Sequence, residues 1–392
     1  MPVAKKILEF MDRSSWIRAM FEEGARLKAE IGAENVFDFS LGNPILDPPD
    51  DFYRVMQELL ADKRPMVHGY MPNAGFPQVR QQVADYLKGI HGVDFQVGDI
   101  IMTVGAAGGL NIALKAIVDP GAEVVVPTPY FVEYDFYLDN HGGKVTRVPS
   151  RDDFGLDLAA LEAAINDQTC AVLINTPHNP TGVVYSQEDL EQLAKLLDEL
   201  GQRRGRPIYL ICDEPYRDII FDGLTVPSLF QIYTHTILVT SFSKNLSLAG
   251  ERMGYVAVHP EIADKAPLVG GMTLANRILG FVNAPALMQR AVGRLLGATA
   301  DVAQYARKRD LICQVLDDAG FEYVKPQGAF YVFPKSLEPD DVAFVKTAQK
   351  ENLLLVPGSG FMGPGHFRIA FCCADDVITR SAPAFKRLRE RY

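Results

Sequence analysis

Apolar and polar positions between residues 171 and 241 follow two alternating patterns. Three short, fully apolar runs predict buried strands of a parallel sheet, because strands that are covered on both faces are apolar throughout. These runs are 171–174, 208–212 and 237–240. Between the first two runs, leucines recur at helical spacing from Leu190 to Leu200, and Ser186 with Asp189 forms a capping box in front of them. The pattern therefore predicts a β-α-β unit.

The same alternation is present upstream. Apolar positions at helical spacing run from Leu110 to Ile117, stop at Pro120-Gly121, and are followed by the apolar run 124–126. Strands that alternate with helices are typical of a mostly parallel sheet sandwiched by helices. We therefore predict the α/β fold class for this part of the chain.

The pattern changes after about residue 290. Long amphipathic helices are predicted at 289–296 and 305–316, followed by short strands around 330–333 and 367–371. We predict a large α/β domain over residues 47–289 and a smaller α+β domain built from residues 1–46 and 290–392. A candidate helix at 16–31 has no sheet partner nearby in the sequence, so we expect it to pack on the smaller domain.

Composition narrows the class of protein. The chain has 392 residues, 48% of them hydrophobic and 22% charged, as expected of an ordinary globular protein. A net charge of -10 without a basic run disfavours nucleic-acid binding, and no apolar run approaches the ~18 residues of a membrane span. Five cysteines without a CxxC pair indicate reduced thiols, and no secretory signal is visible, so we expect a cytoplasmic protein.

One glycine motif is set aside. Gly358, Gly360 and Gly363 spell GxGxxG, but Pro364 follows, where a dinucleotide-binding motif requires a helix. An NAD-linked oxidoreductase would rest on this motif alone. Paired metal-binding histidines, a P-loop and a GxSxG elbow are not found in the sequence, so metal-dependent, nucleotide and serine hydrolase chemistry lack support.

Polar segments follow several predicted strands, where open α/β sheets bind ligands. They are TVGAAGGL at 103–110, NTPHNPTG at 175–182, CDEPY at 212–216 and SFSKNLSLAGERMG at 241–254. The first can expose backbone N–H groups to a phosphate. In the last, Lys244 lies between serines and Arg252, which describes an amine nucleophile beside a phosphate site.

Together with SLGNP at 40–44 and GHFRIAF at 365–371, these motifs resemble the class I and II aminotransferases, which are fold type I pyridoxal 5'-phosphate (PLP) enzymes. The resemblance covers nearly the whole chain. It implies an enzyme that moves the amino group of an L-amino acid to a 2-oxo acid by a ping-pong Schiff-base mechanism. It also implies a homodimer with shared active sites.

The resemblance also implies a role for each motif residue. Lys244 would bind the cofactor aldehyde and then shuttle a proton, and Asp213 would pair with the pyridinium nitrogen. Asn179 and Tyr216 would hydrogen-bond the ring oxygen. The phosphate would be held by Ala106, Ala107, Ser241, Ser243 and Arg252, with Tyr70 reaching it from the second subunit.

Further residues would contact the cofactor ring or the substrate. Tyr130 would stack on the cofactor ring. Arg368 would bind the substrate α-carboxylate as a bidentate fork, assisted by Gly42 and Asn179.

Several alternatives remain open at this stage. Ala107 occupies a position where some aspartate-selecting relatives have a lysine, so we expect a neutral amino donor, unless Arg277 serves a distal carboxylate. A PLP-dependent lyase that catalyses β-elimination would use the same Lys244 and Asp213. A non-catalytic PLP-binding regulator would carry an N-terminal DNA-binding domain, and the residues before Ser40 lack a basic helix-turn-helix pattern.

Overall fold

The computed structural model describes residues 3–392, apart from the side chains of residues 12–21. The chain divides into two compact units. The large unit comprises Pro44–Ala303 and Gln327–Ala329, and the small unit comprises Met1–Asn43, Gln304–Pro326 and Phe330–Tyr392. The large unit therefore continues to residue 303, beyond the 289 that the sequence suggests, and begins at 44 instead of 47.

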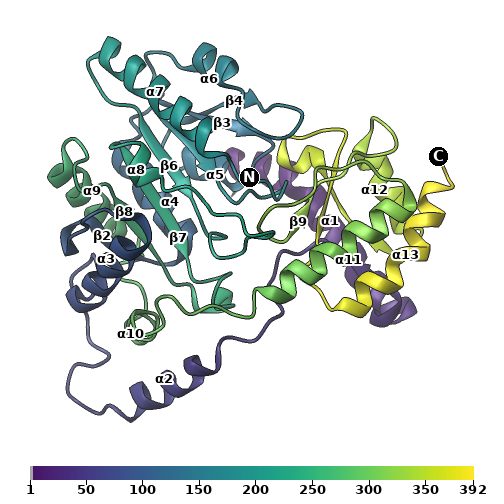
Figure 1. The fold of residues 1–392 in the computed structure, drawn as a ribbon, viewed down its shortest axis with the longest axis horizontal. Coiled ribbons are helices and arrows are strands. Elements are labelled where there is room, and N and C mark those ends of the chain that lie inside the picture. The colour runs from purple at the N-terminus through teal and green to yellow at the C-terminus, as the bar shows by residue number, and fades with distance from the viewer. Residues whose placement is uncertain (1–2) are drawn as a thin grey trace. The chain divides into compact units, whose positions relative to one another are not determined.

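A seven-stranded sheet forms the centre of the large unit (Figure 1), in the order β2-β8-β7-β6-β5-β3-β4. Its strands are β2 (Ile100–Thr103), β3 (Glu123–Thr128), β4 (Lys144–Pro149), β5 (Thr169–Asn175), β6 (Tyr209–Asp213), β7 (Thr236–Ser241) and β8 (Gly254–Val258). Strand β8 runs in the opposite direction to the other six strands of this sheet. The predicted apolar runs lie in β5, β6 and β7, with the first residue of the second run preceding β6, and the α/β fold class is confirmed.

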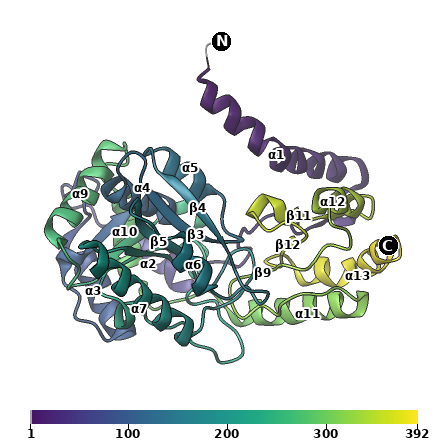
Figure 2. The same ribbon diagram turned by 90° about the horizontal axis from the view of Figure 1, so that it is seen from above.

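Helices lie on both faces of this sheet, with α4, α5 and α9 on one face and α6 and α7 on the other (Figure 2). The helices of the large unit are α2 (Asp50–Ala61), α3 (Pro77–His91), α4 (Gly105–Ile117), α5 (Glu133–Asp139), α6 (Leu158–Ala164), α7 (Gln187–Arg204), α8 (Leu229–Ile232), α9 (Lys265–Ile278) and α10 (Ala286–Gly293). Helix α4 packs on β7 and β8, which fixes the position of its N-terminus relative to the sheet.

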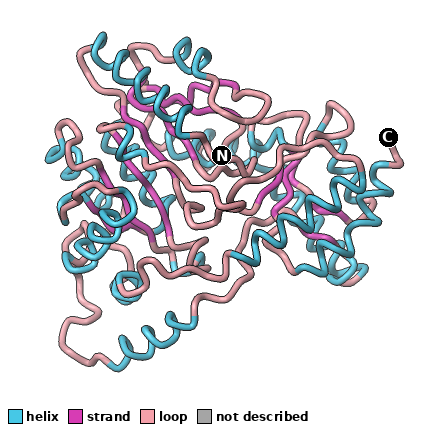
Figure 3. Tube along the Cα trace, in the orientation of Figure 1, coloured by secondary structure: helices cyan, strands magenta, loops and turns pink. Residues whose placement is uncertain are grey.

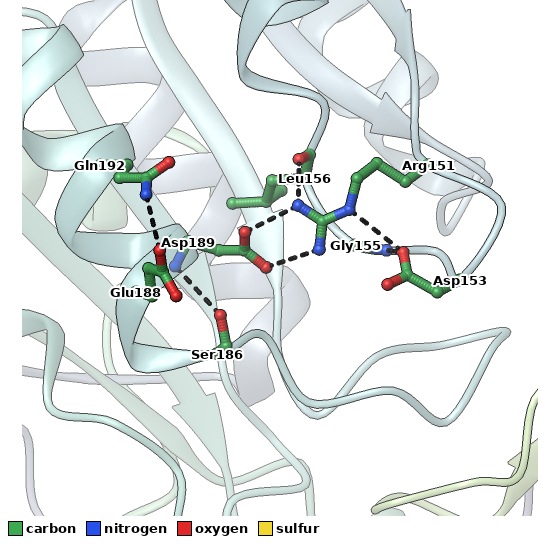
Figure 4. A network of polar contacts seen from close by, with 8 residues as sticks. All are labelled: Arg151, Asp153, Gly155, Leu156, Ser186, Glu188, Asp189 and Gln192. Atoms are coloured by element: carbon green, nitrogen blue, oxygen red, sulfur yellow. Dashed lines mark hydrogen bonds and ion pairs between the residues drawn. The ribbon is translucent and has the colours of Figure 1, made fainter.

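Helix α7 shows how local sequence determines one of these elements. The Ser186 side chain accepts a hydrogen bond from the Asp189 N–H at 3.0 Å, and Gly205 ends the helix in the left-handed region. The predicted capping box is only half formed. The Asp189 carboxylate instead accepts two hydrogen bonds from Arg151, at 2.8 and 3.0 Å (Figure 4). Arg151 thus connects the segment after β4 to the first turn of α7.

We expect Asp189→Ala to lower the free energy of unfolding by about 1 kcal/mol, because it removes a bidentate pair whose Arg151 side is partly exposed. Urea unfolding measures this change. Glu188→Ala is the matched control in the same helical turn, since the Glu188 carboxylate accepts a hydrogen bond from Gln192 on the same helix. Equal losses in the two variants would show that the Arg151 contact adds nothing.

The small unit combines helices with short strands (Figure 3). Its elements are α1 (Lys5–Ile31), η1 (Ala33–Asn35), β1 (Phe37–Asp38), α11 (Ala303–Ala319), β9 (Tyr331–Val332), α12 (Asp341–Gln349), β10 (Leu353–Leu354), β11 (Val356–Pro357), η4 (Gly358–Phe361), β12 (Phe367–Ala370) and α13 (Asp375–Arg389). Strand β1 pairs with β10 in parallel, and β12 pairs antiparallel with β11 and β9. Among residues 3–392, no helix is both long and apolar enough to span a bilayer.

The N-terminal helix packs within this unit, as the sequence suggests, although it begins at Lys5 and not near residue 16. Gly24 brings it close to β10, where an added Cβ atom would lie 2.7 Å from Leu354 Cδ1. A larger residue at position 24 would require the Leu354 side chain to move.

The Gly358–Gly363 segment forms a short 3-10 helix and then leads into a strand, so no long helix follows these glycines. A Cβ atom at Gly358 would lie 2.1 Å from the Gly363 carbonyl oxygen. Gly358 therefore allows the backbone at residue 358 to lie close to the backbone at Gly363. This confirms the decision to set the dinucleotide motif aside.

Candidate active site

The strongest chemical motifs meet at one edge of the large sheet. Strands β5, β6 and β7 are adjacent and parallel, and they end at Asn175, Asp213 and Ser241. Asn175 is paired in register with Asp213, and its Nδ2 donates a 2.6 Å hydrogen bond to the Asp213 carbonyl oxygen. The loops that follow these strands carry Asn179 and Lys244. The sheet thus brings three predicted segments of the cofactor site to one edge.

Asp213 is the most informative residue of this edge. Its carboxylate is buried, and Oδ2 accepts a 2.7 Å hydrogen bond from the Tyr134 hydroxyl. Its second oxygen, Oδ1, is also buried and has no hydrogen-bond partner among residues 3–392. Burial raises the pKa of Asp213 to about 6, while the Tyr134 hydrogen bond and the charge of Lys244 oppose this rise. A buried carboxylate oxygen of this kind suits a cationic donor such as a protonated ring nitrogen.

Lys244 lies three residues beyond β7. Its Nζ atom is 6.0 Å from the centre of the Tyr216 ring, and its charge acts on Asp213. The next residue, Asn245, donates a 2.9 Å hydrogen bond to Asp218 and so anchors the lysine loop to the segment after β6. The structure therefore brings Lys244, Asp213 and Tyr216 together, as the sequence predicts.

The start of α4 has features that suit an anionic group. Gly105 has a φ of 67°, and a Cβ atom there would lie 3.0 Å from Nη2 of Arg252. The guanidinium group is thus held at the first turn of a 13-residue helix, where the N–H groups of Ala106 and Ala107 lack partners within the helix. Helix N-termini and arginine side chains both favour phosphate. Ser241 and Ser243 are both buried.

The Asn179 loop is braced by its own polar groups. The Asn179 backbone N–H donates to Asn175 Oδ1 at 2.7 Å, and His178 Nδ1 lies 2.7 Å from the Thr181 hydroxyl oxygen. Burial lowers the pKa of His178 to about 3, so its imidazole is neutral near pH 7. The loop therefore holds the Asn179 backbone against Asn175, whose Nδ2 in turn bonds to the Asp213 carbonyl oxygen.

Tyr130 does not occupy the position that the sequence suggests. Only 1% of this residue is exposed, and its ring stacks on Tyr134 with 6.1 Å between ring centres. Its hydroxyl donates to Asp135 and accepts from Arg147. The ring has no open face for a ligand, so the predicted stacking role is not supported. The next aromatic residue, Phe131, retains partial exposure.

Two of the predicted substrate residues, Arg368 and Gly42, lie in the small unit, whereas Asn179 belongs to the large unit. Arg368 on β12 is buried, donates a 2.8 Å hydrogen bond to the Ser40 carbonyl oxygen, and lies between two aromatic rings. Its guanidinium carbon is 4.7 Å from the centre of Tyr331 and 4.5 Å from that of Phe361. A Cβ atom at Gly42 would meet the Tyr331 hydroxyl oxygen, so only glycine fits there. The SLGNP and FRIAF motifs thus come together around one fixed cation.

Two other candidates are on the surface. Tyr70 is 90% exposed, and Arg277 is exposed on α9. The main residue that sequence reasoning missed is Tyr134, because no motif marks it. The sequence offered one indirect signal: Tyr134 lies three residues after the segment PTPYF (127–131), which contains the candidate Tyr130.

Comparison with known proteins decides the family. The sequence profile described as "Aminotransferase class I and II" matches residues 34–384. The chain belongs to this aminotransferase family. It therefore transfers the amino group of an L-amino acid to a 2-oxo acid.

Individual relatives of this aminotransferase cover nearly the whole chain. It is 30% identical to the "Aspartate/prephenate aminotransferase" of Thermus thermophilus, over 89% of this chain and 90% of that protein. It is also 30% identical to the "Aromatic-amino-acid aminotransferase 2" of Thermococcus litoralis, over 91% of this chain and 92% of that protein. A solved "Amino Transferase" from Eubacterium rectale matches with a TM-score of 0.97 and 40% identity, covering 100% and 99% of the two chains.

Proposed function

We propose that this aminotransferase uses pyridoxal 5'-phosphate, held by the large unit. The observation that carries the proposal is the buried Oδ1 of Asp213, which lacks a hydrogen-bond partner within the described part of the chain. When bound, PLP supplies an electron-withdrawing ring that accepts the electron pair released when the substrate Cα–H bond breaks. Such a ring works best when its nitrogen is protonated, and the Asp213 carboxylate suits that proton.

The other residues at this edge bind the cofactor or move protons. Lys244 is the amine that would anchor the cofactor and carry a proton on Nζ between the substrate Cα and the C4' atom of the cofactor. Asn179 and Tyr216 donate hydrogen bonds to the ring oxygen. Arg252, Ser241, Ser243 and the N–H groups of Ala106 and Ala107 bind the phosphate.

For the substrate, we propose that Arg368 binds the α-carboxylate with help from the backbone at Gly42, which lies in the same unit. The two rings beside Arg368 support this role, because they fix the orientation of its planar guanidinium group. A fixed arginine loses little side-chain entropy on binding, which favours affinity for amino and 2-oxo acids.

The test is an amino-transfer assay on the PLP-loaded protein. Aspartate, alanine, phenylalanine and methionine serve as donors, each with 2-oxoglutarate, pyruvate or oxaloacetate as acceptor. We expect a new amino acid to form from the acceptor, and the donor ranking checks whether a neutral donor is preferred. Release of ammonia and a 2-oxo acid without amino transfer would instead indicate a β-eliminating lyase.

We further propose a homodimer with shared active sites. Supporting this, α2 and the segment after it expose several large apolar side chains, more than a free surface needs. They are Tyr53, Leu60, Met66 and Tyr70. Mixing two variants tests the sharing: Lys244→Ala and Tyr70→Ala are each impaired alone, and subunit exchange should rebuild one intact site per mixed dimer. Mixtures that recover no activity would contradict shared sites.

The two arginines should give opposite kinetic phenotypes. We expect Arg252→Ala to raise the dissociation constant of PLP about tenfold to a hundredfold, because a charge-assisted pair with the phosphate is lost. Arg368→Ala should instead raise KM for the amino donor with little change in cofactor affinity. Absorbance titration with PLP and steady-state kinetics separate the two effects. Exchanged phenotypes would reverse the assignments.

A further inference from the structure

The Asp213 carboxylate has one partner to which the proposed function assigns no role. Tyr134 on α5 donates its hydroxyl proton to Asp213 Oδ2 at 2.7 Å, and both residues are buried. The two residues are 79 positions apart, so this contact depends on the tertiary packing of α5, which contacts β4 and α4. A hydroxyl group that is buried against a functional carboxylate can act on the chemistry through it.

We propose that Tyr134 is a positioning residue that keeps Asp213 ionised and leaves its Oδ1 for the ring nitrogen of the cofactor. This inference rests on the proposed function. Because Oδ2 is held by Tyr134, the carboxylate cannot rotate without losing that bond. The buried Oδ1 is then the oxygen left to accept a proton donor.

The charges around Asp213 determine the direction of the effect. Lys244 and the Tyr134 hydrogen bond lower its pKa against the rise caused by burial, and Tyr137, Cys212 and Glu214 are the other titratable groups that interact with it. Burial and the Asp213 charge raise the pKa of Tyr134 well above its usual value, so the phenol remains a neutral donor. Removing its hydroxyl should therefore raise the pKa of Asp213.

Tyr134 is itself held in place. Its ring stacks on Tyr130 with 9° between the ring planes, and Phe131 packs edge-on against it with 5.8 Å between ring centres. Tyr130 is fixed in turn through Asp135 and Arg147. The phenol therefore has no room to turn its hydroxyl away from Asp213.

The experiment compares Tyr134→Phe with Tyr233→Phe. Tyr233 is also buried in the large unit and donates a 2.7 Å hydrogen bond, but to the Ile208 carbonyl oxygen, so it matches Tyr134 in burial and hydrogen-bond length without bonding to a carboxylate. Infrared difference spectroscopy of the cofactor-free proteins follows the protonated Asp213 carboxyl band against pH, with Asp213→Asn as the blank. Absorbance titration gives the PLP dissociation constant of each variant.

We expect Tyr134→Phe to raise the pKa of Asp213 by about one unit, a tenfold shift in its protonation equilibrium, and to weaken PLP binding by a similar factor. Tyr233→Phe should change neither quantity. Equal changes in both variants, or none in Tyr134→Phe while the wild type binds PLP, would overturn this inference alone. A wild type that does not bind PLP would overturn the proposed function itself.

Discussion

Lys244→Ala is expected to lower kcat by about four orders of magnitude or more while the protein still folds. The amine is both the anchor of the cofactor and the carrier of the proton, so one substitution removes a covalent attachment and a general base. The loop itself should persist, since Asn245 bonds to Asp218 and the Phe242 N–H bonds to the Met253 carbonyl oxygen. Steady-state kinetics and borohydride trapping of the cofactor measure the two losses.

Lys195→Ala on α7 is the matched control, because this exposed lysine lies outside the proposed site. It should retain both activity and the trapped adduct. If Lys244→Ala kept wild-type turnover without an added amine, another residue would have to be the nucleophile.

Asp213→Asn is expected to lower kcat by at least about a hundredfold, although it removes few atoms. A neutral amide cannot stabilise a positive charge on the ring nitrogen as a carboxylate does, and such electrostatic contacts have effects of this size. Kinetics with saturating PLP measures the loss. Glu214→Gln is the control, because this neighbouring buried carboxylate pairs with Arg217 at 2.9 Å and is not part of the proposed site.

The same substitution should not destabilise the cofactor-free protein. Burial raises the pKa of Asp213 from 3.8 to about 6, so the folded state holds this proton more tightly than the unfolded state. The stability of the wild type therefore falls as the pH rises between these values, by about 3 kcal/mol for this group. Urea unfolding at pH 8 should show Asp213→Asn to be at least as stable as the wild type. A large loss of stability would mean that the carboxylate is structural.

The sequence by itself determined the α/β fold class, about half of the strands and the motif segments that carry the proposed site. These features depend on local sequence. An apolar run such as Ile208–Cys212 is enough to predict a strand that is covered on both faces. A polar residue directly after such a run predicts the edge of the sheet where ligands bind. Lys244, Asp213 and Asn179 were found for this reason. The sequence does not show that the large unit ends at 303 or that β8 is antiparallel, because both depend on which distant segments pair.

Only the tertiary structure decided the partners of the individual side chains. From its place in the sequence alone, Arg368 would be taken for a surface residue. In the structure it donates a hydrogen bond to the carbonyl oxygen of Ser40, 328 positions away, and its guanidinium group lies beside the rings of Tyr331 and Phe361. Tyr130 and Tyr134 are both aromatic residues of one short segment, and their sequence does not show which of them contacts Asp213. Burial and long-range hydrogen bonds arise from how distant segments pack, whereas hydrophobic periodicity reports the surroundings of each segment alone.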